Sequence, residues 1–115
     1  MSKKVKISFV LPTNLQRELK ERVIKDGYDL KGKSRWVSES IVKLLATRDF
    51  HDLVKINDEM KGFEKLESVV ILSDLKKQLD LAIVSIRQHY PAIEGVQSRI
   101  LRTAIMQRLL LGQKS

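Results

Sequence analysis

The most constraining feature of the sequence is a change of hydrophobic period near its beginning. Apolar side chains first alternate with mostly polar ones: Val5, Ile7, Phe9 and Leu11 stand between Lys4, Lys6, Ser8 and Val10. A period of two over this length predicts a β-strand with one buried face. Pro12, which cannot continue a paired ladder, and Thr13, a favourable helix N-cap, then precede apolar residues at helical spacing. A short strand that leads directly into an amphipathic helix is not stable alone, so we expect a second strand beside it.

The same pattern recurs about sixty residues later. A slide of 60 residues aligns Ser8 with Ser68, Phe9 with Val69, Val10 with Val70 and Leu11 with Ile71. A slide of 64 aligns Ser34 and Arg35 with Ser98 and Arg99, and the difference falls in a turn over residues 89–95. Because insertions accumulate in turns, the sequence predicts a true internal repeat.

The repeat gives a strand and two helices on each side of a linker. We predict a first repeat over residues 1–48, a linker with a short helix over 49–64 that Gly62 closes, and a second repeat over 65–115. In the first repeat, one helix is expected from about Asn14 to Asp26 with Gly27 as its C-cap, and Ser34 is expected to cap the next. Trp36 is predicted to lie in the core.

Each unit is too small to bury a core of its own, which predicts how the two halves combine. A unit of about 45 residues is near the lower limit for an independent domain. We therefore expect the two strands to pair antiparallel and four helices to interlock beneath them, as a mainly α fold with a two-stranded β-ribbon. The predicted inner face of the ribbon consists of Ile7, Phe9, Leu11, Val69 and Ile71. Its outer face then carries Lys6, Ser8 and Val10 beside Leu66, Ser68 and Val70.

Charge and composition narrow the class of partner. The net charge is +8, of which +7 belongs to residues 1–48. Such a balance favours a polyanion, nucleic acid before a membrane surface. No run approaches the ~20 apolar residues of a membrane span, and no apolar signal-peptide core follows Lys4. The absence of cysteine excludes disulfides and thiolate metal sites, so a cytoplasmic protein is expected.

Two short segments and the order of elements together resemble a known family. The junction Leu11-Pro12-Thr13-Asn14-Leu15 and the helix start Gly32-Lys33-Ser34-Arg35 are similar to those of ribbon-helix-helix DNA-binding proteins, the MetJ/Arc/CopG class. Members of that family are normally dimers, and two copies in one chain resemble the tandem members, such as TraY-like accessory proteins of conjugative plasmid transfer. The resemblance implies a single-chain pseudo-dimer whose ribbon lies in the major groove of double-stranded DNA.

The resemblance also implies which residues touch DNA. The expected base contacts come from the outward strand positions Lys6, Ser8, Val10, Ser68 and Val70. The expected phosphate contacts come from Lys4 and from the starts of the second helices, at Ser34, Arg35, Trp36, Ser98, Arg99 and Ile100. Helix amides without an intrahelical acceptor and the positive helix end favour a phosphate there.

The second repeat departs from the family pattern. Glu67 falls where an apolar residue should be buried, and a shift by one residue would instead turn Glu67, Val69 and Ile71 outward. In neither register do the three aligned outward positions hold a lysine or arginine that could contact a base. We therefore expect asymmetric recognition, in which the first strand makes most polar base contacts, and a non-palindromic DNA site.

The remaining polar residues predict neither catalysis nor a cofactor. Asp49, His51 and Asp52 are expected to be solvated rather than to bind a metal, and His89 lies in a turn without a partner carboxylate in sequence. The expected role is that of a relaxosome accessory factor or a transcriptional repressor of a plasmid or mobile element, with a relaxase and side-by-side copies as further partners. The alternative is an antitoxin or another protein-interaction module whose first half binds DNA.

Overall fold

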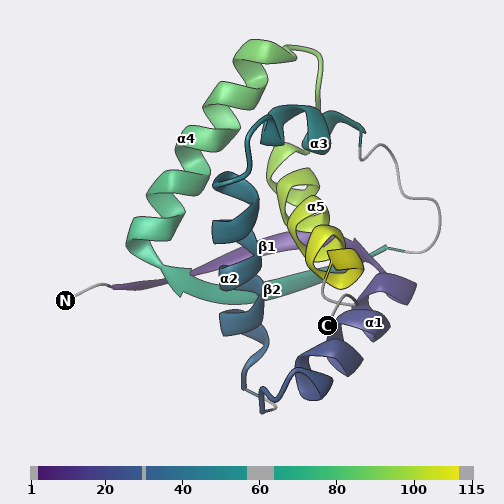
Figure 1. Cartoon of the computed structure of the whole chain (residues 1–115). Helices are drawn as coiled ribbons and strands as arrows, with labels where there is room; N and C mark the ends of the chain where they lie inside the picture. Colours follow the sequence, from purple (N-terminus) through teal and green to yellow (C-terminus); the bar gives the residue numbers. More distant parts are fainter. Residues whose placement is uncertain (1–2, 30, 57–63, 112–115) are drawn as a thin grey trace.

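The computed structural model of the chain describes residues 3–29, 31–56 and 64–111. Two strands and five helices follow in the order β1 (Lys4–Pro12), α1 (Thr13–Lys25), α2 (Lys33–Leu45), α3 (Phe50–Ile56), β2 (Glu64–Leu72), α4 (Ser73–His89) and α5 (Val96–Leu111). The strands form one antiparallel two-stranded sheet (Figure 1). The predicted mainly helical fold with an antiparallel ribbon is therefore confirmed. Gly62 lies outside the described residues.

The register of the ribbon decides between the two alignments of the second strand. Ser8 is paired with Ser68 at the centre of the ladder, and Phe9 is paired with Glu67. Val69 and Ile71 are each only 2% exposed, whereas Leu66 is 74% exposed. The unshifted register is thus the correct one. The predicted inner face is confirmed, since all five of its apolar side chains are buried: Ile7, Phe9, Leu11, Val69 and Ile71.

The inner face of the ribbon is covered by the second helix after each strand. In Figure 1, α2 and α5 cross in front of the ribbon, while α1 and α4 extend from its opposite ends. The helices α2 and α5 contribute the largest buried side chains beneath the strands, including Trp36, Ile41, Ile100 and Ile105, each 0% exposed. Trp36 is a core residue, as predicted. All buried apolar side chains belong to a single cluster, so the two halves of the chain share one core.

Three helices begin earlier than the sequence predicts. The strand β1 includes Pro12, whose missing N–H is tolerated at the last position of the ladder, and α1 begins at Thr13 with Pro12 as its N-cap. Gly32, not Ser34, is the N-cap of α2. In the second half α5 begins at Val96, two residues before Ser98. The predictions were wrong because serine and threonine were assigned to capping, whereas the structure uses Ser34 to bond a strand.

The C-cap of α1 is Asp26, one residue before the predicted Gly27, and the glycine follows it directly. Gly27 has φ +90°, a conformation that side chains disfavour and glycine adopts readily. Its amide donates to the carbonyl of Ile24 at 3.0 Å, and the amide of Tyr28 donates to that of Val23 at 3.0 Å. These two bonds constitute a Schellman motif, in which the residue after the C-cap takes a left-handed conformation. The motif reverses the chain so that α2 can return over the ribbon.

Arg108 joins the end of α5 to α2 and to the turn between α1 and α2. Its Nη1 donates to the carbonyl of Trp36 at 2.7 Å, and its Nη2 donates to the Tyr28 hydroxyl at 3.1 Å. The Tyr28 hydroxyl in turn donates to Glu39. This hydrogen bond and the nearby Arg108 guanidinium lower the pKa of the Glu39 carboxyl against the opposing effect of its burial. The carboxylate therefore remains charged beside Arg108.

Both histidines of the sequence meet where α3 packs beside the end of α4. The rings of His51 and His89 are stacked with centroids 4.5 Å apart. His51 Nε2 lies 2.7 Å from the Ser85 hydroxyl, and the His51 ring also stacks on Phe50 with centroids 4.0 Å apart. Close by, Tyr90 donates to Asp52 at 2.5 Å. Sequence reasoning placed His51 in a solvated linker and His89 in a turn. In the structure His51 belongs to α3 and His89 is the last residue of α4, and the two rings form a contact between these helices.

We predict that Phe9→Ala destabilises the fold by about 3–5 kcal/mol, the range for a buried phenylalanine that leaves a cavity. Phe9 is 1% exposed on the inner face of the ribbon. Urea denaturation followed by circular dichroism measures the change. The matched control is Phe50→Ala, which removes the same atoms from a partly buried site and should cost less. Equal losses in the two variants would contradict the assignment of Phe9 to the centre of the core.

The stability of the fold should fall as the pH is lowered through the range where free histidine titrates. Burial and the neighbouring His89 lower the pKa of His51, against the attraction of Asp52 and Asp49. Because the unfolded chain takes up this proton near pH 6.5, stability should be constant above about pH 7 and decline below about pH 6.5.

The comparison variant is His51→Phe, which keeps an aromatic ring but cannot titrate. Its urea midpoint should fall less between about pH 7.5 and pH 5.5 than that of the unmodified protein. An identical decline in the two proteins would rule out His51 as the titrating group.

Candidate nucleic-acid interface

The outer face of the ribbon carries side chains that are open to a partner. Lys4, Lys6 and Ser8 are exposed, and Val10 is partly buried. On the second strand Leu66, Val70 and Leu72 are 74%, 42% and 47% exposed, and Ser68 is partly buried. The alternation of β1 and β2 thus turns the predicted base-contact residues to one side of the sheet, opposite the core.

The N-termini of α2 and α5 are each bonded to one edge of the ribbon. The amide of Val70 donates to Ser34 Oγ at 3.0 Å, and the amide of Val10 donates to Ser98 Oγ at 3.0 Å. These are corresponding residues in the alignment of the two halves. Because an edge strand leaves alternate amides unpaired, each serine satisfies a backbone donor that the ladder does not use. The two helix starts therefore flank the ribbon on opposite edges.

The second edge contact on β1 was not foreseen from the sequence. Gln97 Nε2 donates to the Ser8 carbonyl at 2.7 Å. Gln97 precedes Ser98, so one helix start bonds both an amide and a carbonyl of the same strand edge. The aligned position in the first half is Lys33, which makes an ion pair instead. The sequence signal for this contact was the polar residue Gln97 directly before Ser98.

The helix starts supply the main-chain amides expected to meet phosphates, though not all of those predicted. The amides of Trp36 and Arg99 donate to the carbonyls of Gly32 and Gly95 at 2.9 and 3.0 Å. They are therefore unavailable to a ligand, and Ile100 lies one residue deeper in α5. The prediction of amide contacts from these three residues is wrong because both helices begin earlier than expected. Helix geometry instead leaves the amides of Lys33, Ser34 and Arg35, and of Val96, Gln97 and Ser98, without intrahelical acceptors.

Arg35 extends into solvent beside this helix start. Its side chain is 77% exposed, with Nε 3.6 Å from Glu39 one turn later and its guanidinium 5.6 Å from the centre of the Tyr28 ring. An ion pair this exposed contributes little to stability. Arg99, at the aligned position of α5, is partly buried. The two halves therefore offer cations of different accessibility at their helix starts.

Glu67 occupies an inward strand position, and two partners satisfy it. Gln16 Nε2 donates to its carboxylate at 2.9 Å, and Lys33 Nζ is both hydrogen-bonded and ion-paired to it. Its side chain is 14% exposed. A carboxylate at a core-facing position requires such partners because burying it alone is costly. The bond also holds Lys33, the first residue of α2, against the underside of the ribbon.

Arg102 is a further buried cation that sequence reasoning missed. It is 9% exposed, and its Nε has no hydrogen-bond partner among the residues that the structure describes. Burial lowers its pKa, Glu64 at the start of β2 opposes that effect, and the charge of Arg99 adds to it. A basic residue among the apolar positions of α5 was the only signal in the sequence. Its position on the inner side of the fold gives no reason to assign it to DNA.

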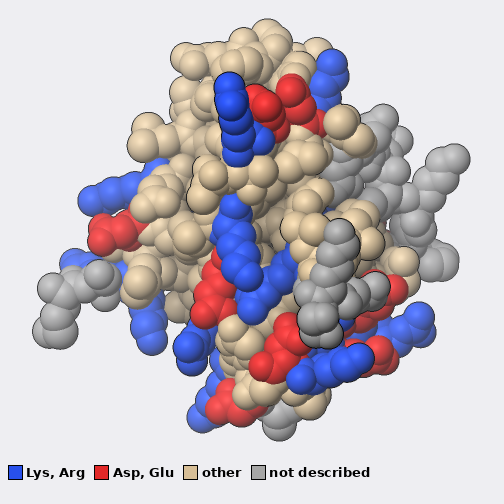
Figure 2. Space-filling view, viewed as in Figure 1, with Lys and Arg blue, Asp and Glu red and all other residues tan. Residues whose placement is uncertain are grey.

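The opposite, helical side of the molecule has a mixed charge. Figure 2 views this side, and acidic and basic side chains are interleaved over its coloured part. Two ion pairs of the helices join residues that are four apart in sequence: Arg22–Asp26 and Lys76–Asp80. Paired charges of this kind largely cancel one another and make the surface polar without attracting a polyanion. The helical side is therefore a poorer nucleic-acid surface than the ribbon.

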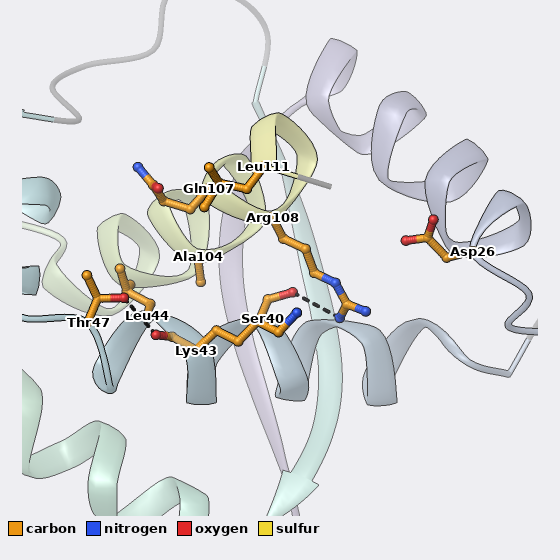
Figure 3. Close-up of a pocket in the computed structure, with 9 residues that line it drawn as sticks. All are labelled: Asp26, Ser40, Lys43, Leu44, Thr47, Ala104, Gln107, Arg108 and Leu111. Atoms are coloured by element: carbon orange, nitrogen blue, oxygen red, sulfur yellow. Dashed lines mark hydrogen bonds between the residues drawn. The ribbon is translucent and has the colours of Figure 1, made fainter. Parts of the chain in front are cut away.

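A hollow lies between α2 and α5 (Figure 3). Arg108 reaches across it toward Ser40, with 3.5 Å between Nη1 and Oγ, and Asp26 stands apart on α1. The hydroxyl of Ser40 donates to the Trp36 carbonyl at 2.8 Å. These polar groups are engaged in joining the helices, and the lining residues do not suggest a nucleophile with an adjacent base. The absence of catalysis remains a prediction.

Metal and membrane sites can be assessed only for the described ranges. Within them, no three His, Cys, Asp or Glu side chains gather closely enough to hold a metal ion. No helix in the described part of the chain has the length and apolar character needed to cross a membrane.

Comparisons with known proteins add no assignment. The sequence matches no protein-family model, and neither the curated proteins nor the solved structures give a significant match to it. The functional argument therefore rests on the residues and geometry of this chain.

The bonds from Ser34 and Ser98 can be tested one edge at a time. Ser34→Ala should expose the Val70 amide and cost about 1 kcal/mol, the usual net value of one hydrogen bond, so this amide should exchange with solvent about fivefold faster. Ser98→Ala should have the same effect on the amide of Val10. Each variant serves as the control for the other in hydrogen-exchange NMR. Faster exchange of both amides in either variant would indicate general loosening instead of a local bond.

Proposed function

We propose that this protein binds double-stranded DNA in a sequence-specific manner as a single-chain ribbon-helix-helix pseudo-dimer. The observation that carries the proposal is the pair of equivalent hydrogen bonds, from Val10 to Ser98 and from Val70 to Ser34, on the two edges of the ribbon. The ladder is centred on Ser8 and Ser68, which the internal repeat aligns. A twofold relation between the halves accounts for both facts.

The shape and chemistry of the ribbon suit the major groove. A two-stranded ribbon fits this groove, whose floor distinguishes all four base pairs. Lys6 can donate to guanine O6 or N7, and the hydroxyls of Ser8 and Ser68 can donate or accept. Val10 and Val70 can contact the methyl group of thymine. These five residues remain the proposed base contacts.

The two helix starts are suited to hold the phosphates on either side of the groove. Their amides without intrahelical acceptors and the positive ends of the helix dipoles favour an anion. Each serine hydroxyl accepts a bond from the strand, so its own hydrogen remains available to donate to a phosphate. Arg35 and Lys4 add exposed cations, and the net charge of +8 strengthens attraction to DNA at long range.

For the biological role, we propose regulation at a DNA site of a plasmid or mobile element. A relaxosome accessory factor and a repressor of its own operon both require sequence-specific binding without catalysis. A protein-interaction role is the second candidate, and one observation favours it. Leu81 and Val84 are 70% and 53% exposed, three residues apart on α4, so they lie on one face of that helix. An antitoxin or a relaxase partner would use such a surface in addition to DNA.

The proposal predicts strongly salt-dependent binding and separable roles for two cations. With about four to six phosphate contacts, log affinity should fall against log salt with a slope near −4 to −5. Lys6→Ala should cost about 1–3 kcal/mol on the preferred site and relax specificity, whereas Arg35→Ala should weaken all sequences alike. Fluorescence anisotropy with sites selected from random duplex DNA provides the measurement.

The matched control is Lys77→Ala, which removes an exposed lysine of α4 that is not among the proposed DNA contacts. It should leave both the selected site and the salt slope nearly unchanged. A flat salt response together with no retention on heparin would favour the protein-interaction module. Unchanged affinity and selectivity in Lys6→Ala would refute the placement of this ribbon face in the groove.

A further inference from the structure

The two ends of the ribbon have different outward side chains. Because the strands are antiparallel, Lys6 lies beside Val70 and Lys4 lies beside Leu72 at one end, which we term the basic end. At the other end, termed the apolar end, Val10 lies beside Leu66, and the last pair joins Pro12 to the exposed Glu64. The asymmetry therefore runs along the length of the ribbon, and not only from one strand to the other as the sequence suggested.

Both ends are equally supported by the helices. The start of α2 is bonded at Val70, in the basic end, and the start of α5 is bonded at Val10, in the apolar end. Each end therefore has a helix start that can hold a phosphate. The two ends differ in the outward side chains of the strands that lie next to each helix start.

The side chains of Val10 and Leu66 in the apolar end cannot exchange hydrogen bonds with a base. Leu66 is 74% exposed, more than Val70 or Leu72, and Val10 beside it is also an aliphatic residue. A base edge rich in donors and acceptors would lose water beneath these side chains without gaining a partner, which is unfavourable. The one apolar group on the floor of the major groove is the C5-methyl of thymine. Burying that methyl against Leu66 is favourable because both surfaces leave water.

The basic end has the opposite preference. Lys6 presents an ammonium donor, and guanine offers two acceptors, O6 and N7, in the major groove. The neighbouring Val70 is 42% exposed and can accommodate an adjacent methyl group. A guanine in this half of the site would satisfy the cation, whereas a thymine-rich sequence would offer it fewer acceptors.

We infer, on the basis of the DNA-binding function proposed above, that the target site is directional. The half beneath the apolar end is read through thymine C5-methyl groups by Leu66 and Val10. The half beneath the basic end contains guanine, read by Lys6. The orientation of the protein on DNA is fixed because a reversed complex would place lysine over methyl groups and leucine over guanine.

The experiment uses the full chain and the preferred duplex obtained by selection from random DNA. Each thymine is replaced singly by deoxyuridine, which removes only the methyl group, and each guanine by 7-deazaguanine, which removes only the N7 acceptor. Loss of one buried methyl should weaken binding about fourfold, and loss of the guanine acceptor should weaken it about fivefold or more. Deoxyuridine should act in one half of the site and 7-deazaguanine in the other.

Variants connect each half of the site with its end of the ribbon. Leu66→Ala should weaken binding and abolish the effect of deoxyuridine, and Lys6→Ala should abolish that of 7-deazaguanine. The matched control is Leu81→Ala, the same change at a leucine that is 70% exposed on α4, which should leave both patterns intact. Because Leu66 is exposed, its truncation should preserve the urea midpoint.

The outcomes separate the directional site from the proposed function. Tight, salt-dependent binding to a palindromic site, or binding that no deoxyuridine substitution weakens, would overturn the directional reading and leave DNA binding intact. Loss of the deoxyuridine effect in Leu81→Ala but not in Leu66→Ala would also overturn it. Failure to bind any duplex at low salt would refute the proposed function and the directional site with it.

Discussion

Pairing between two strands that lie sixty residues apart is the interaction on which the whole structure depends. Within residues 3–29, 31–56 and 64–111, neither β1 nor β2 has another strand beside it, so each provides the ladder of the other. Their paired inner faces form the apolar surface on which α2 and α5 pack. An isolated two-stranded ribbon is marginally stable in water, and this one is stabilised by the helices that it brings together. Strand pairing and helix packing are therefore one cooperative event.

The strands, their faces and the order of the helices could be predicted because they depend on local patterns. Alternation in Val5 to Leu11 identifies the buried face regardless of what covers it. The helix starts were misplaced because Ser34 and Ser98 are bonded to strands distant in sequence, and propensity cannot distinguish that role from capping. The stacking of His51 on His89 was missed for the same reason, since it requires α3 and α4 to meet.

Glu67 is intermediate between features that a local pattern predicts and features that depend on contacts distant in sequence. Its inward position could be read from the alternation, and its charge signalled that partners were needed. Which partners it has could not be read, because Gln16 and Lys33 come from two helices of the other half. The sequence thus identified an unusual position, and the structure supplied the physical explanation. The same holds for the helix starts: amides without intrahelical acceptors were expected there, but which amides these are depends on where each helix begins.

Joining the halves in one chain has a consequence that a dimer of identical subunits cannot have. In such a dimer every outward side chain occurs twice, so the ends of the ribbon are identical by symmetry. Here the aligned positions Lys6 and Leu66 carry different residues, while Ser34 and Ser98, which hold the helix starts to the strands, are the same. The serines that hold the helix starts are thus the same in both halves, as are the outward pairs Ser8/Ser68 and Val10/Val70, whereas Lys6 and Leu66 differ. Because the tether also keeps the halves together at high effective concentration, their assembly does not require the outer faces of the two strands to carry the same residues.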